Sequence, residues 1–179
     1  MPRVRTKNAI RNADPGLAGF SLVELLVVLM VILTIAAIAI PNLVHAKMRA
    51  NEAAAVSSVK TINTAQLMYK DAFPEVGYAS SLADLGANGT SCEKPTSTSA
   101  CLIMDEALTS GLKTGYMFEI VADGNTPAAS YTVTAMPESG LSGRCGISSN
   151  QSGDIRITLP GTPGIAGDRS VGAGGSGCE

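Results

Sequence analysis

The sequence has few of the residues that catalysis, metal binding and nucleic-acid binding require. It contains no tryptophan and a single histidine, His45, among 179 residues. One histidine argues against a multi-histidine metal site and against a His-based catalytic triad. The 13 basic and 15 acidic residues give a formal charge of −2, whereas phosphate binding needs clustered Lys and Arg. We therefore predict neither an enzyme nor a nucleic-acid-binding protein, and we interpret His45 as an interfacial polar residue.

Short catalytic motifs are missing as well. Neither G-x-S-x-G nor H-E-x-x-H occurs. The stretch "GAGGSG" at 172–177 matches a nucleotide-binding glycine pattern, but it neither follows a predicted strand nor opens a predicted helix. A calcium site is conceivable but unspecific, and its candidate ligands are Asp123, Asp154 and Asp168. No catalytic residue, cofactor or metal site is therefore predicted.

One apolar run, residues 20–40, is long enough to cross a membrane. Glu24 is the only charge among its 21 residues, and a rise of about 1.5 Å per residue carries them across about 30 Å of hydrocarbon. A secretory signal has a shorter apolar stretch of about 7–15 residues that ends in a small-residue cleavage site. A buried core helix is the other alternative, but soluble cores rarely cover so long a helix on all sides. We therefore predict a single-pass membrane anchor.

Charge is unevenly distributed around this run. Residues 1–19 carry four basic side chains against Asp14, whereas residues 20–179 carry nine basic and 14 acidic side chains. The basic side chains of the leader are Arg3, Arg5, Lys7 and Arg11. Basic flanks of a membrane span stay in the cytoplasm. The leader is therefore predicted to be cytoplasmic, and the chain after about residue 45 is predicted to be exported.

All four cysteines lie on the side predicted to be exported. They are Cys92, Cys101, Cys145 and Cys178. Their even number and an oxidising compartment favour two disulfides, for which three connectivities exist. We favour Cys92–Cys101 and Cys145–Cys178, because each bond then closes a local loop. The spacing does not resemble that of a zinc site.

A helical pattern continues past the apolar run to about Ala72. Between residues 46 and 73 the apolar side chains share one helix face, which Gln66 interrupts. The members of this face are Val56, Val59, Ile62, Tyr69 and Phe73. The helix should end near Phe73-Pro74. Pro41 should kink it where the apolar run ends, because proline lacks a backbone donor and clashes with the preceding turn.

Residues after Pro74 predict short helices at 79–86 and 101–111, and then strands. Apolar and polar residues alternate at 116–120, 131–135 and 155–159, with a weaker strand near 145–147. Turn signals at 123–125 and 152–153 indicate antiparallel neighbours. A small sheet with one apolar face needs a partner, and the face of residues 56–73 is available. The fold class is therefore α+β: a long spine helix packed on a small antiparallel sheet, with a disulfide-closed tail after Pro160.

Glu24 is the residue that this plan leaves unexplained. A carboxylate inside a bilayer costs roughly 2.5–3.5 kcal/mol on insertion scales and usually has a partner. The helix dipole offsets only about 0.3–1 kcal/mol of that cost. If the leader were removed after Gly19, Phe20 would carry a new α-amino group about one helical turn from Glu24. A neighbouring subunit could then complete this pair between chains.

These residues resemble the type III signal of type IV pilins and pseudopilins. The match is a basic leader ending in Gly19, then Phe20, Glu24 and an apolar span, with Pro41 where the family's spine helix carries a proline. It is close over about residues 14–45 and extends to the remainder only in layout. The resemblance implies cleavage after Gly19 by a prepilin peptidase and N-methylation of Phe20. It also implies extraction from the membrane by an assembly machinery, with Glu24 touching the N-terminus of a neighbour.

The resemblance also orders the expected functions. We expect a cytoplasmic leader at 1–19, an anchoring half-helix at 20–45 and an exported head at 46–179.

The first expectation for the function is a self-associating subunit of a type IV pilus filament. It would lie in the inner membrane with its N-terminus in the cytoplasm before assembly. A type II secretion pseudopilin is the alternative, and a disulfide-closed C-terminal loop favours the pilus. An anchored periplasmic binding domain that never assembles and a membrane-bound enzyme are weaker alternatives.

Overall fold

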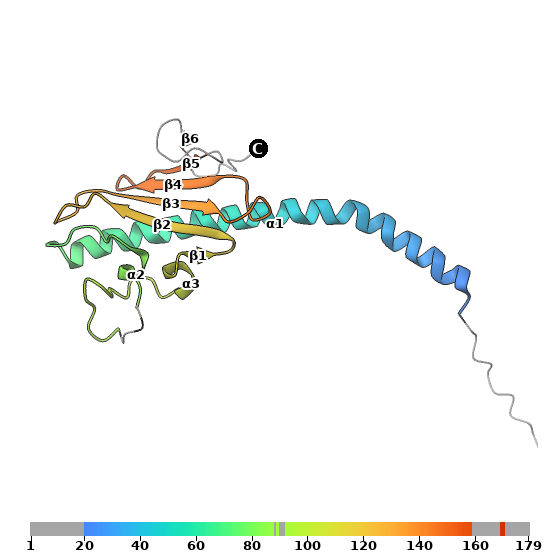
Figure 1. Cartoon of the computed structure of the whole chain (residues 1–179), viewed down its shortest axis with the longest axis horizontal. Coiled ribbons are helices and arrows are strands. Elements are labelled where there is room, and N and C mark those ends of the chain that lie inside the picture. Colours follow the sequence, from blue (N-terminus) through green and yellow to red (C-terminus); the bar gives the residue numbers. More distant parts are fainter. Residues whose placement is uncertain (1–19, 88, 90–91, 159–168, 171–179) are drawn as a thin grey trace, which may run out of the picture. The chain divides into compact units, whose positions relative to one another are not determined.

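The computed structural model of the chain describes residues 20–87, 89, 92–158 and 169–170 (Figure 1). It contains two compact units, Met1–Ile40 and Pro41–Glu179. The helix α1 (Leu22–Ala72) contributes residues to both units. The other elements belong to the second unit.

Within the first unit the described chain is almost entirely helix α1. The first backbone bond of the helix joins the Leu25 amide to the Ser21 carbonyl at 3.2 Å. Thr34 is a polar residue in this apolar stretch, and its hydroxyl donates to the carbonyls of Met30 and Val31 at 3.0 and 2.8 Å. The Thr34 hydroxyl is therefore satisfied within the helix, and α1 is long and apolar enough to cross a membrane.

Helix α1 confirms the predicted long helix. It begins two residues after the predicted start at Phe20 and ends at the predicted Ala72. Pro41 lies inside it and the helix assignment is not interrupted there. The kink expected at Pro41 stays a prediction. The helix ends where the sequence predicts, near Phe73-Pro74. The Phe73 amide makes a last helical hydrogen bond to the Tyr69 carbonyl, and Pro74 follows it.

The second unit contains an antiparallel sheet whose strands follow chain order (Figure 1). The strands are β1 (Leu112–Lys113), β2 (Tyr116–Ala122), β3 (Tyr131–Pro137), β4 (Gly146–Asn150), β5 (Ile155–Thr158) and β6 (Arg169–Ser170). The four predicted strands correspond to β2–β5, although the weak strand near 145–147 runs on to Asn150. The sequence did not predict the two-residue strands β1 and β6, because two residues are too few to show an alternation.

One core joins the sheet to the second half of α1, which runs along the sheet in Figure 1. Val59, Ile62 and Tyr69 are buried on the helix side. The inward residues of β2 and β3 are buried in alternation and belong to the same cluster: Tyr116, Phe118, Ile120, Tyr131, Val133 and Ala135. This is the predicted packing of an amphipathic helix face on an apolar sheet face.

Two short helices precede the sheet. The predicted helix at 79–86 is α2 (Leu82–Leu85), and Ser81 is its N-cap. A capping box stabilises this turn: the Ser81 hydroxyl accepts from the Asp84 amide, and the Asp84 carboxylate accepts from the Ser81 amide. Gly86 is the C-cap residue, and its amide donates to the Ala83 carbonyl, so the helix ends where the predicted segment 79–86 ends.

The predicted helix at 101–111 is wrong over its first half. Only α3 (Glu106–Thr109) is helical, with the Asp105 side chain as its N-cap. Cys101 has a positive φ of 55° and is disulfide-bonded to Cys92. The amides of Leu102 and Ile103 both donate to the Leu85 carbonyl. The chain is not helical here because its amides satisfy the C-terminal end of α2, which helix propensity alone does not reveal.

Candidate assembly site

The first unit exposes apolar surface on every side of α1. Every large apolar side chain from Phe20 to Ile40 is at least 45% exposed. At about 100° per residue these side chains cover the whole circumference of the helix. Soluble monomers rarely expose such a surface. It therefore requires lipid or other apolar helices around it.

Phe20 and Glu24 lie at the N-terminal end of this surface. Phe20 is 74% exposed, and Glu24 lies exposed in the first turn of α1. Among the residues that the structure describes, no cation lies within ion-pair distance of Glu24. Gly19, the other half of the predicted cleavage site, lies outside the described residues. Within the described residues, the Glu24 carboxylate therefore has no cationic partner, and it lies four residues from the predicted new N-terminus.

Pro41 is exposed and is the first residue of the second unit. Just after it, the β3–β4 loop lies against α1. The Asn51 side chain donates to the Ser142 carbonyl at 2.9 Å, and the Arg144 amide donates to the Glu52 carboxylate at 2.8 Å. The Arg144 guanidinium also approaches the His45 ring, with 3.5 Å between Nη2 and Nδ1. Sequence reasoning missed these contacts, because residues about 90 positions apart share no local pattern.

The disulfide predictions are confirmed in part. Cys92 and Cys101 are bonded, as predicted. Cys145 is disulfide-bonded as well, and its predicted partner, Cys178, lies outside the described residues. The loop that the Cys92–Cys101 bond closes also contacts α1, because the Tyr69 hydroxyl donates to the Ser97 carbonyl at 2.6 Å.

Two polar residues on the buried face of α1, Asn63 and Gln66, have partners across the core, whereas the buried Ser58 hydroxyl has no hydrogen-bond partner among the described residues. Asn63 donates to the Ser149 hydroxyl at 2.8 Å and accepts from the Tyr131 hydroxyl at 3.0 Å. Burial raises the pKa of Tyr131 to about 12. Gln66 is fully buried and forms two hydrogen bonds with the backbone of Ala79. Asn63 therefore holds the sheet on α1 through hydrogen bonds, and Gln66, which interrupts the apolar face, holds the 77–80 segment on α1 in the same way.

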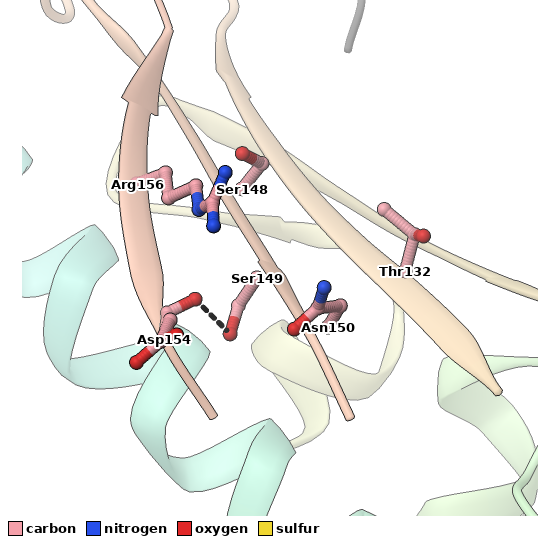
Figure 2. A pocket seen from close by; sticks show the side chains of 6 residues that line it. All are labelled: Thr132, Ser148, Ser149, Asn150, Asp154 and Arg156. Atoms are coloured by element: carbon pink, nitrogen blue, oxygen red, sulfur yellow. Dashed lines mark hydrogen bonds between the residues drawn. The ribbon is translucent and has the colours of Figure 1, made fainter. Parts of the chain in front are cut away.

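A polar crevice crosses strands β3, β4 and β5 (Figure 2). Its volume is about 10 Å³, which is room for about one water molecule. Its lining residues are Thr132, Ser148, Ser149, Asn150, Asp154 and Arg156. The Ser149 hydroxyl donates to the Asp154 backbone carbonyl at 2.9 Å. Asp154 shares the crevice with a guanidinium, so the crevice is a poor cation site.

The sequence offers two other candidate calcium ligands, Asp123 and Asp168. Asp123 accepts hydrogen bonds from its own loop, and Asp168 lies outside the described residues. Within the described ranges, no group of three His, Cys, Asp or Glu residues could hold a metal ion.

Asp123 organises the β2–β3 connection, and its contribution should depend on pH. The amides of Asn125, Ala129 and Ser130 donate to its carboxylate at 3.0–3.1 Å and hold its pKa below the usual range. A lowered folded-state pKa stabilises the fold above the pKa of the unfolded chain, and this stabilisation is lost as pH falls through the folded-state pKa. We expect Asp123→Asn to destabilise the second unit at pH 7 and to have a smaller effect at pH 3, as measured by urea unfolding. An effect of equal size at both pH values would contradict this prediction.

Comparison with known proteins returned nothing: no family model, curated protein or solved structure matches this chain. The fold and the site are therefore interpreted from their own geometry. They define a long helix whose first part is apolar and exposed and whose second part packs in an α+β unit.

Proposed function

We propose that the chain is a structural subunit of a type IV pilus-like filament. The observation that supports this most is that one helix, α1, has two opposite kinds of surface. Its residues 22–40 are exposed and apolar, whereas Ala55, Ile62 and Tyr69 are buried in the second unit. Such a helix can pack with copies of itself through its first part and still hold a folded unit through its second. A protein that only needs an anchor does not require a carboxylate at Glu24.

The proposed life cycle uses the residues at the start of α1. A prepilin peptidase would cut after Gly19, and Phe20 would become the N-methylated N-terminus. The subunit would stay in the inner membrane until an assembly machinery extracts it. The apolar surface of α1 would then leave its contacts with lipid and pack against the apolar helices of neighbouring subunits. Glu24 would pair with the Phe20 amine of a neighbour in a medium of low dielectric constant.

A pilus is favoured over a type II secretion pseudopilus by one observation. Cys145 is disulfide-bonded, which agrees with a disulfide-closed C-terminal region, and the resemblance implies that major pseudopilins usually lack such a region. Shearing filaments from cells and finding this chain in them by mass spectrometry would support the pilus. Filaments confined to the periplasm would favour the pseudopilus, and cleaved chain that never leaves the membrane fraction would contradict both.

Processing provides a direct test of the proposal. The mature chain should begin at Phe20, and Gly19→Leu should accumulate as uncleaved protein, because a bulky side chain would block the bond at the cut. Terminal sequencing of membrane-extracted protein measures both. Gly16→Leu is the matched control and should be cleaved normally. An intact leader in the wild type, or a mature start at Ala46 or later, would contradict the proposal.

A further inference from the structure

Three cations surround α1 just after its apolar part. Lys47 and Arg49 are exposed on α1, and a rotation of about 200° separates two residues that are two positions apart, so they project from nearly opposite sides. Arg144 is exposed too, and the β3–β4 loop brings it to the same helix turns through Glu52 and His45. We call Lys47, Arg49 and Arg144 the cationic collar.

The collar has little negative charge of its own to neutralise it. Glu52 is the only acidic residue of α1 between Pro41 and Lys60, and its carboxylate accepts from the Arg144 backbone. In the described part of the chain, an ion pair joins Lys113 to Asp105 at 2.8 Å, and no ion pair involves a collar cation. The collar cations are therefore available to an external anion.

In the sequence the collar lies just beyond the headgroup layer of a membrane, within reach of long side chains. A bilayer measures about 30 Å across its hydrocarbon and about 40–45 Å with headgroups, which leaves roughly 5–8 Å of headgroup on each side. Lys47 and Arg49 follow Ile40 by seven and nine residues, or about 10–14 Å of helix. Long Lys and Arg side chains can lie back toward the membrane from this distance.

Exposed leucines accompany these cations. Leu43 is 69% exposed on α1, and Leu141, three residues before Arg144, is 70% exposed. Apolar side chains beside cations are typical of segments that lie in a lipid interface. A purely acidic protein partner would satisfy the cations and leave the leucines uncovered. An anionic phospholipid offers phosphate to the cations and acyl chain to the leucines.

We propose that the cationic collar binds anionic phospholipid phosphates on the exported face of the membrane, and so holds the unassembled subunit at a fixed depth. The inference rests on the membrane anchoring in the proposed function but not on filament assembly. Extraction of the subunit then requires release of these phosphates.

The test compares lipid selectivity in the full chain. Wild type and variants are reconstituted in phosphatidylcholine vesicles that carry spin-labelled phosphatidylglycerol or spin-labelled phosphatidylcholine, and electron paramagnetic resonance gives the relative association constant. The double variant K47Q/R49Q should lower the preference for phosphatidylglycerol by up to about five-fold for each cation removed at low salt. R144Q should lower it as well. K47R/R49K retains both charges and should retain the preference.

A matched variant separates the collar from net charge. K60Q/K94Q removes two exposed cations of the second unit outside the collar, and it should keep the wild-type preference. The basic leader is present in every variant, so its own attraction to anionic lipid cancels. Equal preferences in K47Q/R49Q and K60Q/K94Q would overturn the proposal. An unchanged preference in K47Q/R49Q together with fewer filaments would assign the collar to a neighbouring subunit and overturn it too.

Failure of the proposed function would look different from these outcomes. An uncleaved chain without filaments would contradict the pilus proposal, while a preference for phosphatidylglycerol that depends on the collar would still support lipid binding.

Discussion

Replacing Glu24 by Gln is expected to reduce filament number sharply, while synthesis, leader cleavage and disulfide formation remain normal. Gln keeps the size of the side chain and removes its charge. The benefit of Glu24 should arise when the Phe20 amine of another subunit comes within ion-pair range among apolar helices. Removing one partner of a buried pair costs about 3–5 kcal/mol, which repeats at every subunit of a filament.

Glu24→Asp should give an intermediate number of filaments, because its carboxylate is retained but reaches less far. Glu75 is exposed in the second unit, and Glu75→Gln is the matched control that should assemble normally. The measurement is filament counting by electron microscopy at equal amounts of cleaved subunit. If Glu24 only extends to the membrane interface, Gln inserts equally well. Normal filament numbers for Glu24→Gln would then contradict the assembly role.

Local patterns carried most of the fold prediction. The apolar run, the stripe around Val59 and Ile62, and the alternation in β2 and β3 each depend on side-chain period, which a single segment displays by itself. The Cys92–Cys101 bond was predictable for a similar reason, since the two cysteines are nine positions apart in the sequence. These features needed no knowledge of what packs against them.

Features that depend on distant partners were not predictable. Residues 101–105 contain helix-forming side chains, yet they are not helical, because the amides of residues 101–103 bond to the end of α2. The contacts of Arg144 with Glu52 and His45 join segments about 90 residues apart. The sequence shows that Lys47 and Arg49 lie close together on one helix. Only the structure shows that Arg144 lies beside them.

Gln66 illustrates this difference within one helix. In the sequence it interrupts an apolar stripe, whereas in the structure its side chain satisfies both backbone groups of one buried residue. Its Nε2 donates to the Ala79 carbonyl at 2.9 Å, and its Oε1 accepts from the Ala79 amide at 2.8 Å. Both residues are 0% exposed, so water is excluded from these groups.

We expect Gln66→Met to lower the free energy of unfolding of the second unit by about 2–5 kcal/mol. Met fills a similar volume without making either bond, and each buried group left unpaired costs about 1–3 kcal/mol. Small domains have only about 5–15 kcal/mol of stability, so this loss is large. Urea unfolding followed by tyrosine fluorescence measures it selectively, because the chain has no tryptophan and Tyr69, Tyr78, Tyr116 and Tyr131 are all buried in the second unit.

The control for this prediction is the opposite substitution, Met to Gln, at position 68 of α1. Met68 is 53% exposed, so Met68→Gln should change the unfolding free energy by no more than about 0.5 kcal/mol. The urea dependence should keep the same slope in both variants, since neither changes the surface exposed on unfolding by much. A Gln66→Met variant as stable as Met68→Gln would mean that the Ala79 amide and carbonyl find other partners. The two hydrogen bonds would then contribute nothing to holding the 77–80 segment on α1.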